Sequence, residues 1–294
     1  MNEAAMGIDI GGTQIKAVVV DRLGAVQRRE LRPTEGNVDF AAMVRLLAKE
    51  LGPDLPVGIS APGLVQRDRR SVACMPGRLQ GLEGLDWTAW LKSRLPVWVC
   101  NDAHAALLGE KWIGAAQPFQ NVFMLTLGTG VGGAILIDGE LYRGNIGRAG
   151  HLGHVCLDHQ SKELSITGMP GALECFLGNY NIRERTNGRF ETTHALIEAH
   201  RAGDAEASRV WSASIHSLAC ALASFINILD PEAIVIGGGI AQAGKALFDP
   251  LAEELQKIEW RPLGQRVEVL PAQLGEWAGA IGVAADAFKR QAED

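Results

Sequence analysis

The segment from Arg148 to Cys175 gathers side chains whose types could bind a metal or take part in catalysis. They are His151, His154, Cys156, His159, Glu174 and Cys175. Zinc sites usually present their ligands as close pairs, such as C-x2-C or H-x3-H. Here Cys156 follows His154 after a single residue, and Cys175 has no close partner. The spacing therefore leaves two interpretations open, a bound metal or a polar loop at the edge of a cleft.

Two glycine-rich turns lie between strand-like segments. The first is "DIGGT", which begins at Asp9, and the second is "GTGVGG", from Gly128 to Gly133. The second matches G-x-G-x-x-G, but the following "AILIDG" resembles a strand and not the helix that a dinucleotide site needs. We interpret both as hairpin turns whose backbone N–H groups can approach phosphate oxygens. For either turn taken alone, an ordinary tight hairpin is the alternative.

Asp9 could hold a metal ion beside a phosphate group. It precedes two glycines and a hydroxyl, a grouping suited to a hydrated Mg²⁺ and a terminal phosphoryl group. If the second turn faces the first across a cleft, the two turns clamp a nucleoside triphosphate. A third glycine cluster, Gly237 to Gly239, follows a predicted strand and lets a base or ribose approach the backbone.

Asn101 and Asp102 stand where a predicted strand ends and a helix begins. A helix N-terminus favours the ionised form of a carboxylate. Phosphoryl transfer requires its base mainly to position the nucleophile, so an ordinary ionised aspartate is sufficient. Asp102 is therefore the candidate base for a substrate hydroxyl, and the alternative is that it only caps the helix.

The elements around these residues indicate an α/β protein with two lobes. Strand-like segments and helical segments alternate, and the two hairpins suggest two lobes built on one plan. A loop at 114–121 marks the crossing between them. We expect an N-terminal lobe over 1–117 and a C-terminal lobe over 118–279. A last helix at about 280–294 is expected to pack on the first lobe.

Composition excludes several classes of protein. The chain has 294 residues and 47% apolar content, which is ample for two cores. Its net charge of −6, without a run of Lys or Arg, argues against a nucleic-acid or anionic-membrane partner. The five cysteines are scattered, and the first residues lack a leader pattern. We expect a cytoplasmic protein with a small polar ligand and no membrane helix in its longest uncharged stretch.

An ordered series of motifs resembles the ROK (repressor, open reading frame, kinase) family of sugar kinases. In chain order they are "DIGGT", "SAPG", "ND", "LGTGVGGA", "AGHLGH", "PGALE", "DPEAIVIGGGI" and "LGEWAGAIGVA". The resemblance covers nearly the whole chain. It implies a two-lobed, actin-like (ribonuclease-H-like) fold with ATP and sugar in the cleft between the lobes.

The resemblance also implies roles for individual positions. Asp102 matches the catalytic base. The expected sugar-binding residues are Gly63, Asn101, Asp102, His151, His154 and Glu174. The expected ATP-binding residues are Asp9, Gly11, Gly12, Thr13, Thr129, Gly130, Gly132, Gly238 and Gly239, with Asp9 also at Mg²⁺.

The chain departs from the family pattern at a structural zinc site. Members commonly carry Glu-x-Gly-His and then Cys-x-Cys-Gly-x-x-Gly-Cys-x-Glu, in which three cysteines and the histidine bind zinc. Here Ser165, Thr167 and Ala172 stand where the thiols belong. Hydroxyl and methyl groups cannot replace soft thiolates, so we expect no family zinc site. A rearranged site using Cys156, His159 or Cys175 remains open.

The substitution at His151 bears on the substrate. Members with Glu there place a carboxylate near the first and second carbons of the sugar. Some bacterial N-acetylmannosamine kinases resemble this chain in having Ala-Gly-His-x-Gly-His. A neutral imidazole can donate a hydrogen bond to an acetamido carbonyl, whereas a carboxylate can only accept. Drift at a tolerant position is the alternative.

We therefore expect an ATP- and Mg²⁺-dependent kinase for a hexose or N-acetylhexosamine, of the glucose or N-acetylmannosamine type, acting at the 6-hydroxyl. We expect a homodimer. The family's transcriptional repressors carry a helix-turn-helix before "DIGGT", for which the residues ahead of Asp9 leave no room. A catalytically weak sugar-binding regulator is the remaining alternative. The sequence leaves open the physiological sugar and a phosphoryl donor other than ATP.

Overall fold

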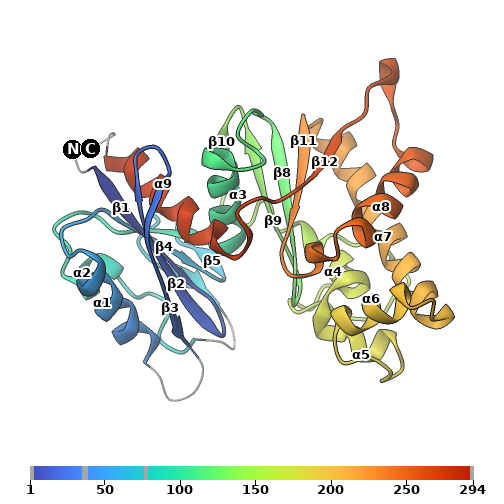
Figure 1. Ribbon diagram of the computed structural model, residues 1–294, viewed down its shortest axis with the longest axis horizontal. Coiled ribbons are helices and arrows are strands. Elements are labelled where there is room, and N and C mark those ends of the chain that lie inside the picture. Colours follow the sequence, from blue (N-terminus) through green and yellow to red (C-terminus); the bar gives the residue numbers. More distant parts are fainter. Residues whose placement is uncertain (1–2, 35–38, 76–78, 292–294) are drawn as a thin grey trace. The chain divides into compact units, whose positions relative to one another are not determined.

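The computed structural model describes residues 3–34, 39–75 and 79–291. The chain divides into two compact units. Unit 1 comprises residues 1–118, 141–149 and 273–294, and unit 2 comprises residues 119–140 and 150–272. The final residues of the expected C-terminal helix, 292–294, lie outside the described part. Figure 1 labels the elements of both units.

Unit 1 is built on a mixed sheet with the strand order β3-β2-β1-β4-β7. The strands are β1 (Ala4–Ile10), β2 (Gln14–Asp21), β3 (Val26–Pro33), β4 (Val57–Ala61) and β7 (Trp98–Asn101). β2 pairs antiparallel with both β1 and β3, whereas β1, β4 and β7 run parallel. A short hairpin, β5 (Leu64–Val65) and β6 (Val72–Cys74), follows β4. The expected opening strand–turn–strand is confirmed as the β1–β2 hairpin.

The two faces of this sheet are covered by different helices (Figure 1). Met6, Ile8 and Ile10 pack in one core with α1 (Phe40–Leu51) and α2 (Trp87–Leu91). Because side chains alternate along a strand, Ala5 faces the other way and packs against α9 (Ala278–Gln291). α3 (Asp102–Ile113) packs beside α9.

Glycines let α9 lie directly on the sheet of unit 1. A Cβ at Gly7 would lie 1.8 Å from the carbonyl oxygen of Ala280, and one at Gly58 would lie 2.0 Å from that of Val283. On the helix itself, a Cβ at Gly282 would lie 1.8 Å from the carbonyl oxygen of Ala105 in α3. These distances are far below van der Waals contact, so only glycine fits at these three positions.

Unit 2 contains a sheet with the strand order β10-β9-β8-β11-β12. Its strands are β8 (Val122–Leu127), β9 (Val131–Ile137), β10 (Glu140–Leu141), β11 (Ala233–Gly237) and β12 (Glu268–Pro271). Its α-helices are α4 (Leu173–Leu177), α5 (Ile182–Arg185), α6 (Thr193–Arg201), α7 (Ala205–Leu229) and α8 (Lys245–Ile258). The short 3-10 segments are η1 (Leu152–His154), η2 (Asn179–Asn181), η3 (Ile240–Ala243) and η4 (Pro262–Gly264), with η5 (Gly275–Trp277) in unit 1. β8 and β9 form the expected second hairpin.

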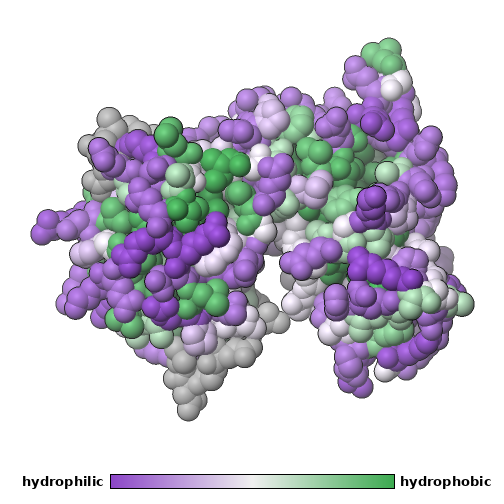
Figure 2. Space-filling model, viewed as in Figure 1, coloured by the Kyte–Doolittle hydropathy of each residue, from purple (hydrophilic) through white to green (hydrophobic). Residues whose placement is uncertain are grey.

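The helix α7 organises the core of unit 2. By length and composition it could match a membrane span, but Trp211, Leu218 and Leu222 on it are buried in the unit 2 core. Phe225 meets Phe123 of β8 edge-on, with ring centroids 5.6 Å apart. Between α8 and β12 a segment projects from unit 2, and its tip is hydrophobic (Figures 1 and 2). Leu263, in this segment, is 97% exposed.

Two segments belong to a different unit from the one that the sequence indicated. Residues 141–149, placed in the C-terminal lobe, cluster with unit 1. There Arg143 donates to the carbonyl oxygen of Gln66, and the carbonyl oxygen of Ala149 lies 3.0 Å from Nε2 of the buried His104. Residues 273–279 also belong to unit 1, where the buried Glu110 accepts two backbone N–H bonds, from residues 273 and 274. A local sequence pattern does not report contacts between distant segments, so it could not predict that these residues belong to unit 1.

Candidate active-site residues

Asp9 occupies the penultimate position of β1, on the face that α9 covers. Its Oδ1 accepts a 2.6 Å hydrogen bond from the hydroxyl of Ser60 in β4. A Cβ at Gly279 of α9 would lie 3.0 Å from the Asp9 carboxyl carbon, so the helix begins against this side chain. Burial raises the pKa of Asp9 to about 6; Ser60 opposes that shift, Asp102 adds to it and Lys16 opposes it.

The first glycine turn is fixed by backbone hydrogen bonds. Gly11 N–H donates to the carbonyl oxygen of Gln14 at 2.9 Å, and the carbonyl oxygen of Thr13 accepts from Thr34 at 2.8 Å. The Thr34 hydroxyl also donates to the carbonyl oxygen of Gly11. Gly12 and Thr13 are exposed. The turn is therefore rigid at its base and exposed at its tip, where a phosphate could be bound.

Asn101 is the N-cap of α3. From the sequence, Asp102 was the alternative candidate for this cap. Oδ1 of Asn101 accepts from the N–H groups of Ala103 and His104, and its Nδ2 donates to the carbonyl oxygen of Gly63. An amide nitrogen carries two hydrogens, so one remains for a ligand. Asp102 stands in the first turn with its side chain exposed. Oδ1 of Asp102 also accepts from the N–H of Ala103, at 2.8 Å, so Asp102 shares the capping of this turn with Asn101 and lies where the helix dipole favours its ionised form.

Gly63 holds a backbone conformation that other residues rarely adopt. Its φ is +96°, and a Cβ there would lie 2.5 Å from the carbonyl oxygen of Cys74. This explains the glycine of "SAPG", because its carbonyl must reach Asn101 while the chain passes close to β6. Ser60 of the same motif was not among the predicted site residues, although its hydroxyl contacts Asp9.

In unit 2, the second glycine turn lies against Glu174. A Cβ at Gly130 would lie 2.5 Å from Oε2 of Glu174, and the N–H of Val131 donates to the same oxygen at 3.3 Å. The carbonyl oxygen of Thr129 accepts from Tyr180 N–H. Gly132 lies within β9, opposite Thr126. The proposed phosphate turn and the proposed sugar ligand are thus in direct contact within one unit.

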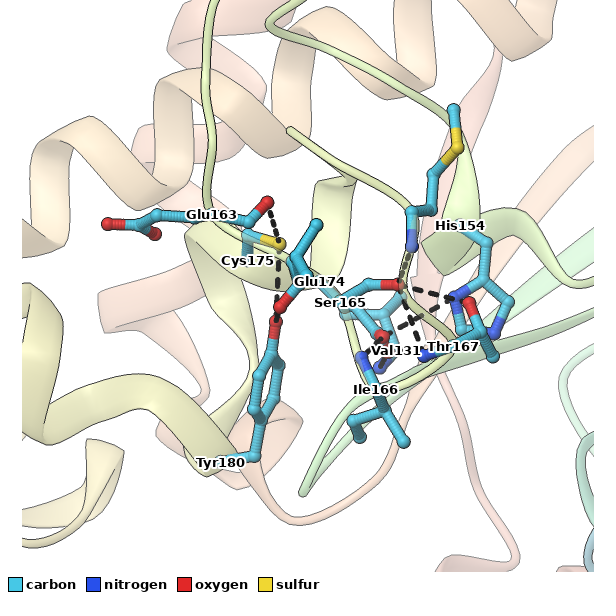
Figure 3. A network of polar contacts seen from close by, with 11 residues as sticks. Val131, His154, Glu163, Ser165, Ile166, Thr167, Glu174, Cys175 and Tyr180 are labelled. Atoms are coloured by element: carbon cyan, nitrogen blue, oxygen red, sulfur yellow. Dashed lines mark hydrogen bonds and ion pairs between the residues drawn. The ribbon is translucent and has the colours of Figure 1, made fainter. Parts of the chain in front are cut away.

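Glu174 is 2% exposed and lies in the first turn of α4. Its Oε1 accepts from Ile166 N–H at 2.8 Å and lies 3.3 Å from Nδ1 of His154 (Figure 3). Burial alone would raise the pKa of Glu174, but His154 and the two backbone N–H groups together lower it. Glu174 is therefore ionised at neutral pH. His151 stacks on His154, with ring centroids 6.1 Å apart.

A cavity of about 430 Å³ opens in unit 2. Its volume falls in the range of small-molecule sites, roughly 300–1,000 Å³. The lining comprises Gly128, Thr129, Asn179, Thr192, Thr193, His194, Ile197, Arg201, Gly239, Ile240, Gln242 and Ala243. Thr193 is 2% exposed, and its hydroxyl has no hydrogen-bond partner among the described residues. No sequence motif pointed to Thr193 or Asn179 as cavity residues.

The third glycine cluster borders this cavity. Gly238 has φ +90°, and a Cβ there would lie 2.3 Å from the carbonyl oxygen of Leu127 at the end of β8. A Cβ at Gly239 would meet nothing within 4 Å. Gly238 is therefore required by the close approach of two strand ends, whereas Gly239 opens the wall of the cavity.

The residues at the expected zinc positions do not fit zinc. Ser165 is buried, and its hydroxyl oxygen accepts from the N–H groups of Thr167 and Met169 and contacts the Thr167 hydroxyl at 3.0 Å (Figure 3). A serine hydroxyl engaged in this way is a poor ligand for Zn²⁺, which prefers thiolate or imidazole. In the part of the chain that the structure describes, no three His, Cys, Asp or Glu side chains are grouped to hold a metal.

The alternative metal ligands are also dispersed. Cys156 and His159 are exposed, whereas Cys175 is buried and contacts the Tyr180 hydroxyl at 3.2 Å. Cys175 also donates to the carbonyl oxygen of Glu163 at 3.7 Å (Figure 3). The segment from Arg148 to Cys175 is therefore closed by hydrogen bonds around Ser165, Glu174 and Cys175.

The chain is similar to known sugar kinases along nearly its whole length. A glucokinase from Thermotoga maritima is 31% identical over 304 residues, covering 95% of each chain. The crystal structure of a ROK family glucokinase from Streptomyces griseus with glucose and AMPPNP is 30% identical. It has a TM-score of 0.80 and covers 97% of this chain and 99% of that one. The fold is thus the two-lobed, actin-like ATPase fold that the sequence indicated.

Regulators are also among the relatives. A xylose repressor from Bacillus subtilis is 24% identical and covers 95% of this chain and 75% of its own. A model of the ROK family matches residues 5–290. Taken with the glycine turns, Asn101–Asp102 and Glu174, this match means that the chain belongs to the ROK family.

Proposed function

We propose that the protein is an ATP- and Mg²⁺-dependent sugar kinase that phosphorylates the 6-hydroxyl of a hexose or an N-acetylhexosamine. The observation that carries the proposal is the pair of carboxylates in unit 1. Asp102 is exposed at the start of α3, and it is close enough to Asp9 that its charge raises the pKa of Asp9. The similarity to glucokinases supports the same activity.

Asp102 would orient the sugar hydroxyl and accept its proton. A helix N-terminus favours an ionised carboxylate, and a hydroxyl can donate a hydrogen bond to it. The transition state of phosphoryl transfer is loose, so the base acts mainly by positioning the attacking oxygen. Asn101 supports this role, because its cap fixes the first turn of α3.

Glu174 and His154 would bind sugar hydroxyls. Glu174 is held by backbone N–H groups from β9 and from the loop before α4, so its carboxylate is already oriented when a ligand arrives. A preorganised acceptor of this kind loses little entropy on binding. His151, stacked on His154, is the candidate contact for the substituent at the second carbon.

The cavity in unit 2 would hold the nucleoside, and the glycine turns would hold its phosphates. The buried Thr193 hydroxyl supplies a polar group that needs a partner. Asp9 fits a Mg²⁺ ion, which usually binds through one or two carboxylates and the phosphates of the substrate. When bound, the ion neutralises charge on the phosphates.

A coupled assay for ADP release, run with ATP over a panel of hexoses and N-acetylhexosamines, tests the proposal. We expect turnover with at least one sugar. Asp102→Asn should lower kcat by a factor of roughly a hundred or more while sugar binding is retained. Asp86→Asn is the matched control, because Asp86 caps α2 elsewhere in unit 1. If both substitutions lowered kcat by the same factor, the role of Asp102 would be structural and not catalytic.

The second candidate function is a sugar-binding regulator without strong catalysis. The similarity to the xylose repressor and the substituted thiols favour it. Calorimetry separates the two functions. A wild-type protein that binds a sugar in the micromolar range and transfers no phosphoryl group to it from ATP would support the regulator.

A further inference from the structure

Arginine side chains of unit 1 gather around Asp286 of α9 and Trp98 of β7. The buried Arg69 donates to both carboxylate oxygens of Asp286, and Nε of Arg290 lies 3.5 Å from one of them. The guanidinium carbons of Arg70 and Arg290 lie 4.2 and 5.0 Å from the ring centroid of Trp98. These residues are separate from the candidate sugar-binding and ATP-binding residues.

Arg143 brings a further positive charge to this group. Its side chain is half-buried and donates to the carbonyl oxygen of Gln66, a neutral acceptor, at 3.2 Å. Burial lowers the pKa of Arg143, and the charges of Arg69 and Arg290 lower it further, whereas Asp286 acts in the opposite direction. The guanidinium of Arg143 is therefore close enough to the other two to be repelled by them.

We call Arg69, Arg70, Arg143 and Arg290 the arginine cluster. Its four positive charges exceed the one negative charge of Asp286, which Arg69 and Arg290 share. Within the part of the chain that the structure describes, no ion pair joins Arg70 or Arg143 to a carboxylate. This excess stands out because the whole chain has a net charge of −6. An anion bound in the cluster would relieve the repulsion between its members.

The turn between β5 and β6 directs two consecutive arginines to the cluster. Arg69 has a φ of +62°, a left-handed conformation that residues other than glycine rarely adopt. The cost of this conformation is offset by the buried ion pair with Asp286. The side chain of Asp68 accepts the backbone N–H of Arg70 and so caps the turn. The backbone of the turn therefore holds one arginine at Asp286 and the next over Trp98.

We propose that the arginine cluster binds a phosphate group, either as inorganic phosphate or as part of a small phosphorylated metabolite. Phosphate oxygens accept several charged hydrogen bonds at once, and the planar guanidinium group matches their geometry. Stacking on Trp98 uses the flat face of the Arg70 guanidinium, so the N–H groups in its plane can donate to a ligand. The phosphate contacts Arg70 and Arg143. This inference goes beyond the proposed function and does not depend on it.

Calorimetric titration of the full chain with inorganic phosphate, at constant ionic strength, tests the proposal. The wild type should bind phosphate saturably. Arg143→Met should weaken this binding about 10- to 100-fold, the usual effect of losing one charged hydrogen bond, and Arg70→Met should also weaken it. Arg143→Lys keeps the charge and should retain more of the affinity. Arg45→Met is the matched control, because Arg45 also stacks on a tryptophan of unit 1, Trp90, and should leave binding within about twofold.

Hydrogen exchange locates the bound phosphate. Phosphate should slow exchange of the amides at 66–71 and 286–290 in the wild type and not in Arg143→Met. The proposal is overturned if the wild type does not bind phosphate saturably or if Arg143→Met binds it as tightly as the wild type. It is also overturned if Arg45→Met is as harmful as Arg70→Met, or if the protected amides lie only at the glycine turns.

A second titration, with glucose 6-phosphate, distinguishes the two sources of the phosphate group. If Arg143→Met weakens binding of glucose 6-phosphate at least as much as that of inorganic phosphate, the cluster accepts a phosphorylated metabolite. If only inorganic phosphate is affected, the cluster takes the free anion. Neither titration requires kinase activity, so failure of the proposed function would leave this test intact.

Discussion

Asp9 is costly to ionise in the folded protein, because burial raises its pKa to about 6 from a model value of 3.8. A raised carboxyl pKa means that this residue favours the folded state most below about pH 4 and that the benefit is lost as the pH rises through 6. At pH 8 the ionised Asp9 therefore lowers the free energy of unfolding. Residues with a functional role often lower the free energy of unfolding in this way.

Replacing Asp9 by Asn should stabilise the protein at high pH and abolish kinase activity. Without Mg²⁺ at pH 8, we expect the free energy of unfolding to rise by up to about 3 kcal/mol, the equivalent of the pKa shift. At pH 4 the gain should nearly vanish, because Asp9 is then protonated. Thermal unfolding at both pH values measures this. An equal effect at both, or destabilisation at pH 8, would contradict the burial argument.

His151 is expected to influence which sugar is used. His151→Glu places a carboxylate where relatives of the glucokinase type have one, and a carboxylate cannot donate to an acetamido carbonyl. We expect the ratio of kcat/KM for glucose to that for N-acetylmannosamine to rise about tenfold or more. Assays of both sugars decide it. If both respond equally, or if the wild type already prefers glucose strongly, His151 does not select the sugar.

Among the elements of unit 2, the loop between Ser161 and Ala172 is held by backbone and hydroxyl hydrogen bonds. Leu164 and Pro170 form an antiparallel bridge, and Ser165 N–H donates to the carbonyl oxygen of Met169 at 2.9 Å. The Ser165 hydroxyl closes the tip of this small hairpin. Because Ile166 N–H then reaches Glu174, the conformation of the loop sets the orientation of a proposed sugar ligand.

The purified protein is predicted to contain no stoichiometric zinc, and Ser165→Ala is predicted to loosen this loop. Hydrogen exchange of the loop amides should accelerate and the sugar KM should rise several-fold, with kcat changed less. Ser161→Ala is the matched control, because the Ser161 hydroxyl accepts from the N–H of Glu163 at the start of the loop and not from the N–H groups at its tip. Metal analysis that finds about one zinc per chain would contradict the prediction and direct attention to His154, Cys156, His159 and Cys175.

At the scale of the whole molecule, the proposed groups are divided between the units. Asp9, Asn101 and Asp102 belong to unit 1, whereas Thr129 and Glu174 belong to unit 2. The chain passes from one unit to the other near residues 118, 140, 149 and 272. The proposed kinase reaction therefore uses groups from both units.

Sugar and AMPPNP are therefore predicted to bind cooperatively. Binding of one should tighten binding of the other, and thermodynamic linkage requires the two factors to be equal. Calorimetric titration of each ligand with and without the other measures both factors. Strictly independent binding in the two titrations would count against the shared use of the units. The expected homodimer is a separate prediction, which sedimentation can test.

The sequence alone determined the two β-hairpins and the types of side chain available at the candidate site. Strand alternation and β-branched residues predicted the β1–β2 and β8–β9 hairpins, because side-chain period and turn glycines are local properties. The order of the motifs identified the family, which the family match confirms. The sequence alone also predicted the loss of the family zinc ligands, because Ser165, Thr167 and Ala172 carry no thiol and metal binding depends on residue type.

Tertiary structure decided what depends on contacts between distant segments. It made Asn101 the cap of α3 by joining it to Gly63, and it assigned residues 141–149 to unit 1. It placed Lys16 opposite Asp9, because strand register and not sequence spacing makes them neighbours. The raised pKa of Asp9 and the buried hydroxyl of Thr193 likewise arise from packing, and burial is a property of the whole fold that no single segment carries.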